Sequence, residues 1–553
     1  MRRMVFNLLC GLLVLLFFWS GSHAPKDAQD QFNLPAFARL PIKDEGRIKP
    51  IDTVARNLLK TLSGRQSCKT EDGDKRSATE WLLDLVSDRP EALNDRVVKI
   101  ENADVLSMLE LEDRKGRRYS FNEISPNWDA LISAAQAARF RTASDRDAYD
   151  HQLIKLTDAL SEYRRVISAF HSAENQNADH LPRLIPPQEG SEEWLLLGEC
   201  DDSTRSTFMA LLEAYQAQDA ARFNQALSEY EKLLQSRSAP LRNVRLEEFY
   251  NRLNIFIKSV GLYLFVFLLS CFGWLSRKDR LLQCAQLFLW LAFIPHTLGI
   301  VVRMILSGYP PITNLYSSVV FVGWGGVAAG LIIERRTREK LPGTGCLIGS
   351  VVGFITLLIA HSMAGDGDTI EQMSAILNSR FWLAVHVVTI SLGYIAALVA
   401  GLLGVITILA GSFSRRIERK AAEELARMLY ATTCFALLLT FIGTLLGGLW
   451  ADIAWGRFWG WDPKENGALL IILWNTIMLY ARRILQVGLR GFSVIATFGN
   501  AVTAWSWFGV NQLGIGLHAY GFTDAGNRWL SLFILSQLAI CALGLLSPRL
   551  RKR

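Results

Sequence analysis

Three tryptophans stand within seven residues of this chain, at Trp455, Trp459 and Trp461, and Asp-Pro-Lys-Glu follows them at 462–465. Indole rings at a membrane edge commonly anchor a helix at the level of the lipid headgroups. That role accounts for one or two of the three. Three at this spacing, with glycines between them, predict a flat aromatic shelf, which would suit a large planar ligand that needs an apolar face and a polar rim.

The end of this stretch also has a local structural interpretation. Asp462 suits the N-cap of a helix, Pro463 its first position, and Glu465 stands three residues after the cap. The apolar run that follows is the helix they would start. We therefore expect Asp462 and Glu465 to cap a helix, a role that does not exclude ligand contact.

Two histidines are candidates for metal ligation. His386 lies about two turns into an apolar run, and His518 lies in a loop near the C-terminus. A neutral imidazole is a good axial ligand for haem iron, and a pair can close both faces of the macrocycle. Alone, His386 would more often be an interfacial histidine with a satisfied hydrogen bond. Together with His518 and the aromatic shelf, His386 is more readily explained as a ligand of haem iron.

A third histidine, His296, falls near the middle of an apolar run. Burying it without a partner would be costly, so we expect either a ligand there or a hydrogen bond to a neighbouring helix. His361 lies at the end of another run and is expected at the interface.

Transmembrane helices must position these residues. Half of the 553 residues are hydrophobic, and residues 251–553 hold one apolar run after another. The fold class is therefore a polytopic α-helical membrane protein of about nine spans, each near the ~20 residues that cross a bilayer. The expected spans are 254–275, 281–306, 315–333, 347–364, 381–411, 429–450, 468–484, 491–509 and 529–546.

The loops between these spans differ in charge. Those near 277–280, 335–340, 415–420 and 482–490 and the C-terminal tail are basic, whereas those at 307–314, 362–380, 451–467 and 510–528 are nearly free of Lys and Arg. By the positive-inside rule the basic loops and the C-terminus are cytoplasmic, so the tryptophan and His518 loops are external. Because the basic residues of 251–553 are concentrated in the loops on one side of the membrane, the net charge of +7 does not indicate nucleic-acid binding.

Residues 1–24, with a basic start, an apolar stretch and small residues at the end, predict a signal peptide or an uncleaved anchor. Residues 25–250 would form an external domain of mixed, mainly helical structure. We expect a helix at 54–62, short strands near 97–100 and 119–121, and helical periodicity at 146–173 and 203–237. A helix at 241–257 should run straight into the first span. A disulfide between Cys68 and Cys200 is one option for the domain's two cysteines.

Together these residues resemble a known family. The pattern Trp455-Gly-x-x-Trp459-x-Trp461-Asp-Pro-Lys-Glu, flanked by histidines in external segments, is similar to the WWD signature of haem-handling proteins. Within them it most resembles CcsA (ResC), the cytochrome c synthase component also found as CcsBA fusions. Residues 379–386 and 516–522 look like that family's two external histidine segments, and the resemblance covers roughly residues 281–546.

The resemblance implies a bacterial inner-membrane protein for cytochrome c biogenesis. Haem b, as substrate, would be held by His386 and His518 against the tryptophans and Asp462, and joined to the Cys-x-x-Cys-His segment of an apocytochrome c. A CcsB/ResB-like protein and thiol-reducing proteins are implied partners. Where the family usually has another histidine this chain has Tyr480. A tyrosine can ligate haem iron, but a packing or interfacial role is favoured here. Either His296 carries the internal haem site alone, or there is no such site.

Two other functions are alternatives to synthase activity. A haem carrier or exporter would share the WWD signature and pass haem to a separate synthase. A secondary transporter predicts repeated halves and interrupted helices at mid-membrane, which the sequence does not show.

Overall fold

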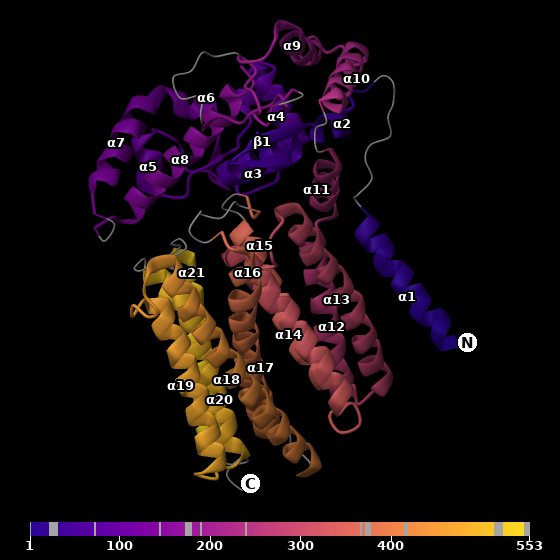
Figure 1. Cartoon of the computed structure of the whole chain (residues 1–553), viewed down its shortest axis with the longest axis vertical. Helices are drawn as coiled ribbons and strands as arrows, with labels where there is room; N and C mark the ends of the chain where they lie inside the picture. Colours follow the sequence, from indigo (N-terminus) through magenta and orange to yellow (C-terminus); the bar gives the residue numbers. More distant parts are fainter. Residues whose placement is uncertain are drawn as a thin grey trace. The chain divides into compact units, whose positions relative to one another are not determined.

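The computed structural model describes residues 2–20, 31–70, 73–142, 145–171, 180–188, 191–237, 241–364, 368–370, 378–413, 419–513 and 524–546. These residues are mostly helical (Figure 1). The chain divides into two compact units. One, called here the membrane unit, comprises residues 1–18, 254–362 and 373–553, and the other, called the polar unit, comprises 19–253 together with 363–372.

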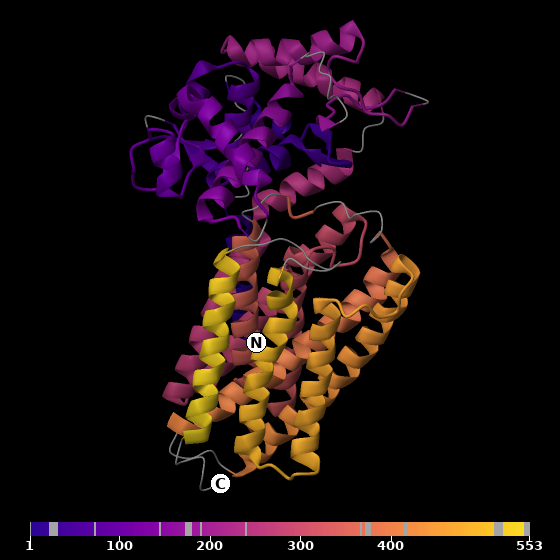
Figure 2. The same ribbon diagram turned by 90° about the vertical axis from the view of Figure 1, so that its left-hand side faces the viewer.

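Long helices that run side by side build the membrane unit (Figure 2). In chain order its elements are α1 (Arg2–Trp19), α12 (Ile255–Ser276), α13 (Asp279–Ser307), α14 (Leu315–Thr337), α15 (Thr344–Met363), α16 (Arg380–Trp382), the π-helical turn η6 (Leu383–Val387), α17 (Val388–Phe413), α18 (Arg419–Trp455), α19 (Pro463–Arg483), α20 (Leu489–Ala504), the π-helical turn η7 (Trp505–Gly509), the 3₁₀ turn η8 (Val510–Leu513) and α21 (Asp524–Leu546).

A helix occupies each of the nine apolar runs expected from the sequence. Seven of the described helices are long and apolar enough to cross a membrane, and α19 and α20 are not among them. The multi-pass character of the chain is therefore confirmed, and the count of nine spans stays a prediction. The apolar part of α1, Val5–Trp19, is shorter than these seven.

Helix α17 is the centre of the membrane unit. It packs against α14, α18, α20 and α21. Within the segment Arg380–Phe413, 78% of the most apolar 18-residue stretch is buried inside the protein. The corresponding stretch of Asn527–Leu546 is only 17% buried. Gly404 permits part of this packing, because a Cβ there would lie 2.6 Å from the Ser493 carbonyl oxygen of α20. A residue on the buried face of α17 is thus held by several neighbouring helices.

The first span does not continue directly from the helix before it. The sequence predicts one helix from 241 into the span, but α11 (Leu241–Leu253) ends one residue before Asn254, whose φ of 47° is left-handed, and α12 begins after it. Asparagine tolerates this conformation better than most residues. The break falls where the two units divide.

Short strands and helices make up the polar unit. Its elements are α2 (Leu34–Ala38), β1 (Pro41–Asp44), β2 (Arg47–Pro50), α3 (Ile51–Ser63), β3 (Ser67–Lys69), β4 (Lys75–Ser77), α4 (Ala78–Val86), η1 (Pro90–Asn94), β5 (Val98–Lys99), α5 (Ala103–Met108), β6 (Arg118–Tyr119), α6 (Phe121–Ile124), η2 (Ser125–Asn127), α7 (Trp128–Phe140), α8 (Ala148–Ser168), α9 (Asp202–Gln216), α10 (Ala220–Ser236) and α11. The strands pair as three antiparallel two-stranded ribbons, β1 with β2, β3 with β4 and β5 with β6.

Several predictions for this unit are confirmed. The expected helix at 54–62 is α3, and the two expected strand pieces pair as β5 and β6. The periodicity at 203–237 belongs to two helices rather than one, because Asp219 caps a second helix by accepting from the Arg222 N–H. The Cys68–Cys200 disulfide is not formed: both are buried free thiols, and burial raises the pKa of Cys68 to about 12.

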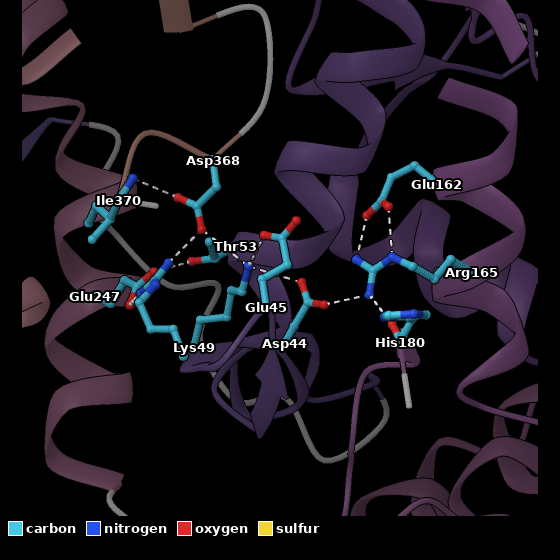
Figure 3. A network of polar contacts seen from close by, with 11 residues as sticks. Asp44, Glu45, Lys49, Thr53, Glu162, Arg165, His180, Glu247, Asp368 and Ile370 are labelled. Carbon is cyan, nitrogen blue, oxygen red and sulfur yellow. Dashed lines mark hydrogen bonds and ion pairs between the residues drawn. The ribbon is translucent and has the colours of Figure 1, made fainter. Parts of the chain in front are cut away.

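A buried ion network ties Asp368 into the polar unit (Figure 3). Lys49 of β2 lies 2.9 Å from the Asp44 carboxylate and 3.2 Å from that of Asp368. Arg47 contacts Asp368 at 2.7 Å and also pairs with Glu247 of α11. All of these side chains are at most 11% exposed. Each buried charge therefore has an opposite charge beside it, as burial requires.

Candidate functional site

One cavity of the membrane unit brings together three of the residues that the sequence singled out, His386, Trp455 and Trp459. It encloses about 200 Å³ between η6, α17, α18, the loop that leads into α19, and η7. Its exposed lining surface is mainly apolar, and polar side chains from several elements also contribute to it. The described residues that line it are Ile312, Thr313, Asn314, Leu315, Ser318, Leu383, His386, Val387, Ile390, Ser391, Tyr394, Thr444, Gly447, Gly448, Trp450, Ala451, Trp455, Phe458, Trp459, Lys464, Glu465, Ala468, Trp507 and Asn511.

The loop between α18 and α19 is closed at both ends by its own sequence. At the end of α18, Gly456 takes a left-handed φ of 70° and donates its N–H to the Asp452 carbonyl. At the start of α19, the Asp462 carboxylate accepts from the Lys464 N–H at 2.8 Å and the Glu465 carboxylate from the Asp462 N–H at 3.1 Å. The predicted capping box is thus confirmed.

The three tryptophans of this loop do not form one flat shelf. Trp455 and Trp459 line the cavity, whereas Trp461 is not among the lining residues and is 71% exposed. The rings of Trp459 and Trp461 are perpendicular, at 88°. Trp461 has a left-handed φ of 57°, so the backbone reverses there just before the cap at Asp462. Asp462 itself is buried at the helix start and is not a lining residue.

His386 lies in η6, and its imidazole faces the cavity. Its Nδ1 is 2.8 Å from the Gly443 carbonyl oxygen of α18. Because a carbonyl only accepts, Nδ1 carries the proton, and in the neutral imidazole Nε2 then carries the lone pair. The Trp450 indole lies edge-on to the ring, with centroids 5.8 Å apart. This is the tautomer in which a histidine ligates a metal through Nε2.

Glycine at 447 makes room for that ring. A Cβ on Gly447 would lie 2.6 Å from His386 Cε1, closer than such atoms approach in proteins, and 3.2 Å from Nε2, which is a tight contact. The α18 helix thus approaches the imidazole through its backbone. We infer that the position of the His386 ring depends on the absence of a side chain at this site.

Two π-helical turns contribute to the lining, and the sequence did not predict either. Leu383, His386 and Val387 come from η6, and Trp507 comes from η7. Single π-turns inside α-helices occur frequently at functional sites. The sequence reasoning also missed Trp450, Phe458 and Trp507 as lining residues, although an excess of aromatic residues around the WWD stretch was the signal that could have suggested them.

A polar corner of the cavity consists of Lys464, Asn511 and the Trp507 carbonyl. Lys464 Nζ donates to that carbonyl at 2.7 Å, and Asn511 Nδ2 donates to it at 3.0 Å. Asn511 is 2% exposed, and its Oδ1 has no hydrogen-bond partner within the described part of the chain. A buried acceptor of this kind is rare, and it calls for a donor from water or a ligand.

His296 lies elsewhere. It is fully buried on α13, its Nε2 is 3.1 Å from the Val320 carbonyl oxygen of α14, and its Nδ1 is 3.0 Å from the Tyr263 hydroxyl of α12. Both ring nitrogens therefore have hydrogen-bond partners on neighbouring helices. Of the two roles expected from the sequence, this geometry favours the hydrogen-bonding one, and His296 does not line the cavity of His386.

Two further residues were singled out from the sequence, His518 and Tyr480. His518 lies outside the described residues. Tyr480 of α19 is 54% exposed and does not line the cavity, which agrees with an interfacial or packing role.

Comparison with known proteins places this cavity in a family. The profile of the Cytochrome C assembly protein family matches residues 312–518, which include η6, the α18–α19 loop and η7. The chain is 30% identical over 312 residues to the cytochrome c biogenesis protein CcsA of Synechococcus sp. strain WH7803, a match that covers 48% of this chain and 95% of that protein.

Two further similarities cover different lengths. The chain is 26% identical over 506 residues to protein NrfI of Wolinella succinogenes, covering 87% of this chain and 53% of NrfI, so it spans about half the length of that relative. A solved structure of the cytochrome c haem lyase CcmF aligns over 53% of this chain and 49% of its own, with a TM-score of 0.39 and 19% identity, too low to support an argument.

The CcsA protein of Synechococcus matches over 95% of its length, and the segment that the family profile matches, residues 312–518, contains the cavity with His386 and the tryptophan loop. The chain therefore belongs to the CcsA family of cytochrome c biogenesis proteins.

Proposed function

We propose that the cavity of His386 binds haem as a substrate and presents it to an apocytochrome c for covalent attachment. His386 Nε2 is the axial ligand on one side of the iron, and His518 supplies the second. Trp455, Trp459 and Trp450 provide the apolar surface against the macrocycle. The single observation that carries this proposal is the His386 imidazole, fixed by Gly443 in its metal-binding tautomer, inside an indole-lined cavity.

The size of the cavity limits how haem can bind. A space of about 200 Å³ is below the ~300–1,000 Å³ of common small-molecule pockets. A macrocycle held by His386 therefore protrudes from the cavity, and one edge stays accessible. An accessible edge is what attachment to a second protein requires.

The proposed attachment reaction requires no nucleophile or general base from the protein itself. Each cysteine thiol of a Cys-x-x-Cys-His segment adds across one haem vinyl group: a C–S bond forms at one vinyl carbon, and the thiol proton goes to the other. No electron acceptor or donor is consumed. Haem supplies the reactive vinyl groups, and the site contributes placement and the exclusion of water.

The topology proposed with this function follows from the loop charges. The tryptophan loop, the His518 segment and residues 25–250 lie outside a bacterial inner membrane, and the C-terminus lies in the cytoplasm. The proposed partners are an apocytochrome c, a CcsB/ResB-like protein and thiol-reducing proteins. A second candidate function is that of a carrier that passes haem to a separate synthase, which the same cavity would also serve.

The test is the optical spectrum of the full chain, purified in detergent with added haem. Wild type should show a six-coordinate bis-imidazole spectrum, and His386→Ala and His518→Ala should each lose it. His361→Ala is the control, because this exposed histidine does not line the cavity. An unchanged spectrum in both variants would show that His386 and His518 are not the ligands of the haem iron. Coexpression with a Cys-x-x-Cys-His reporter then separates synthase from carrier, since a carrier alone leaves the reporter without covalent haem.

A further inference from the structure

The polar corner of the cavity contains a charged group that haem-iron ligation does not use. Lys464 is the one lysine or arginine among the described lining residues. Its ammonium donates to the Trp507 carbonyl at 2.7 Å, which occupies one of its three N–H groups. A cation at the edge of an apolar cavity is costly unless it meets an anion there.

The carboxylates near Lys464 are engaged by other groups. Glu465 accepts hydrogen bonds from the N–H groups of Gly460 and Asp462 and pairs with Arg457 at 3.2 Å. Asp462 lies close enough to interact electrostatically with Lys464, but its Oδ1 accepts from the N–H of the first helical turn. Neither carboxylate forms a direct ion pair with the Lys464 ammonium among the contacts of the described residues.

Asn511 gives a second, independent sign of a ligand. Its amide is almost fully buried beside Lys464, and both side chains donate to the same carbonyl. Its Oδ1 lacks a donor within the described chain. A water that bridges this oxygen to a bound carboxylate would supply the donor, since such waters commonly complete the bonding of buried polar groups.

We propose that Lys464 is a ligand-binding residue that pairs with a carboxylate of the molecule in the cavity, and that the polar corner thereby selects a planar apolar ligand with an acidic side chain. This inference rests on the proposed function, because it concerns the same cavity and names the chemistry of the ligand's polar edge. The ion pair would fix which edge enters the cavity, and so which edge stays accessible.

The experiment compares two probes that differ only in charge, metal-free protoporphyrin IX and its dimethyl ester. Neither contains iron, so His386 ligation plays no part. Binding to the full-length chain in detergent is followed by quenching of tryptophan fluorescence. Wild type should bind the free acid about tenfold or more tightly than the ester, as expected for a charge-assisted hydrogen bond. Lys464→Gln should remove that preference without weakening binding of the ester.

Two further variants make the result specific. Lys464→Arg keeps the charge and should restore most of the preference for the acid. Arg457→Gln removes a positive charge from the same loop at a residue that does not line the cavity, and should leave the preference intact.

Equal binding of acid and ester by wild type, or an unchanged preference in Lys464→Gln, would overturn the proposal. A wild type that discriminates between the porphyrins but shows no bis-imidazole spectrum with haem would instead overturn the ligation by His386 and His518 and leave the carboxylate pairing supported. A wild type that binds no porphyrin would overturn both.

Discussion

The carboxylate of Asp368 lies 2.7 Å from the guanidinium of Arg47, a residue 321 positions earlier in the chain (Figure 3). Asp368 follows α15 in the sequence, yet it belongs to the polar unit through this pair and through Lys49. Asp368 is thus held in the polar unit by charge.

Replacing Asp368 with Asn should loosen the β1–β2 ribbon. The change leaves two buried cations with one carboxylate fewer, at a cost of about 2 kcal/mol, less than for an isolated buried pair because Glu247 and Asp44 remain. Amide hydrogen exchange of residues 41–50 should become about 30-fold faster. Asp113→Asn, which removes a mostly exposed carboxylate paired with Arg117, is the control and should change little. Unchanged exchange in Asp368→Asn would show that the pair does not hold the ribbon.

Acid should destabilise the polar unit through the same residues. Burial opposes ionisation of Asp44 and Asp368, but the neighbouring cations outweigh it and hold the pKa of each below its ordinary value. Their stabilisation is therefore complete above the unfolded pKa of about 4 and is lost as the pH falls below it. The fall in hydrogen-exchange protection of residues 41–50 from pH 5 to pH 3, after correction for the intrinsic exchange rate, should be larger in wild type than in Asp368→Asn. Equal falls would contradict this assignment.

Replacing Gly447 with Ala should disturb His386 specifically. The new methyl group would overlap the imidazole, so the ring must move from its bond to Gly443. We expect loss of the bis-imidazole haem spectrum, with a stability cost of about 1–3 kcal/mol from overpacking. Gly261→Ala on α12 is the matched control, because a Cβ there meets nothing within 4 Å. A normal haem spectrum in Gly447→Ala would mean that the ring is not held as described.

The two tryptophans on either side of Gly460 should differ in importance. Trp459 lines the cavity and Trp461 does not. Trp459→Ala should weaken haem binding about tenfold through lost apolar contact, whereas Trp461→Ala should leave it nearly unchanged. Haem titrations of the two variants measure the difference directly. Equal losses of haem affinity in the two variants would contradict this difference and support the continuous aromatic shelf that the spacing alone predicts.

Local patterns in the sequence were sufficient to predict the helices and the cap. Apolar runs of the length of a bilayer correspond to helices, and Asp462, Pro463 and Glu465 stand in the geometry that their side chains favour at a helix start. Both follow from short-range physical chemistry, because hydrophobicity and side-chain hydrogen bonds act within a few residues.

The arrangement of the site was harder to predict because it depends on distant residues. Spacing did not show that Trp461 turns away from Trp459, since that depends on one left-handed φ. It also did not show that Trp450, Lys464 and Asn511 meet His386 in one cavity, because they come from different helices. The two options for His296 were distinguished only by the positions of Tyr263 and Val320.

The π-turn at Leu383–Val387 has a consequence for how this site is built. It holds one residue more per hydrogen-bonded turn than the α-helix that continues from it at Val388. Each residue of a helix turns the chain by about 100° about the helix axis. The extra residue therefore rotates the side chains that precede it, about that axis, relative to the side chains that follow it. The direction in which the imidazole points is thereby uncoupled from the face with which α17 meets its neighbours. Deleting Val387, which lies between His386 and α17, would rotate the imidazole by about 100° relative to that face while leaving α17 itself in register.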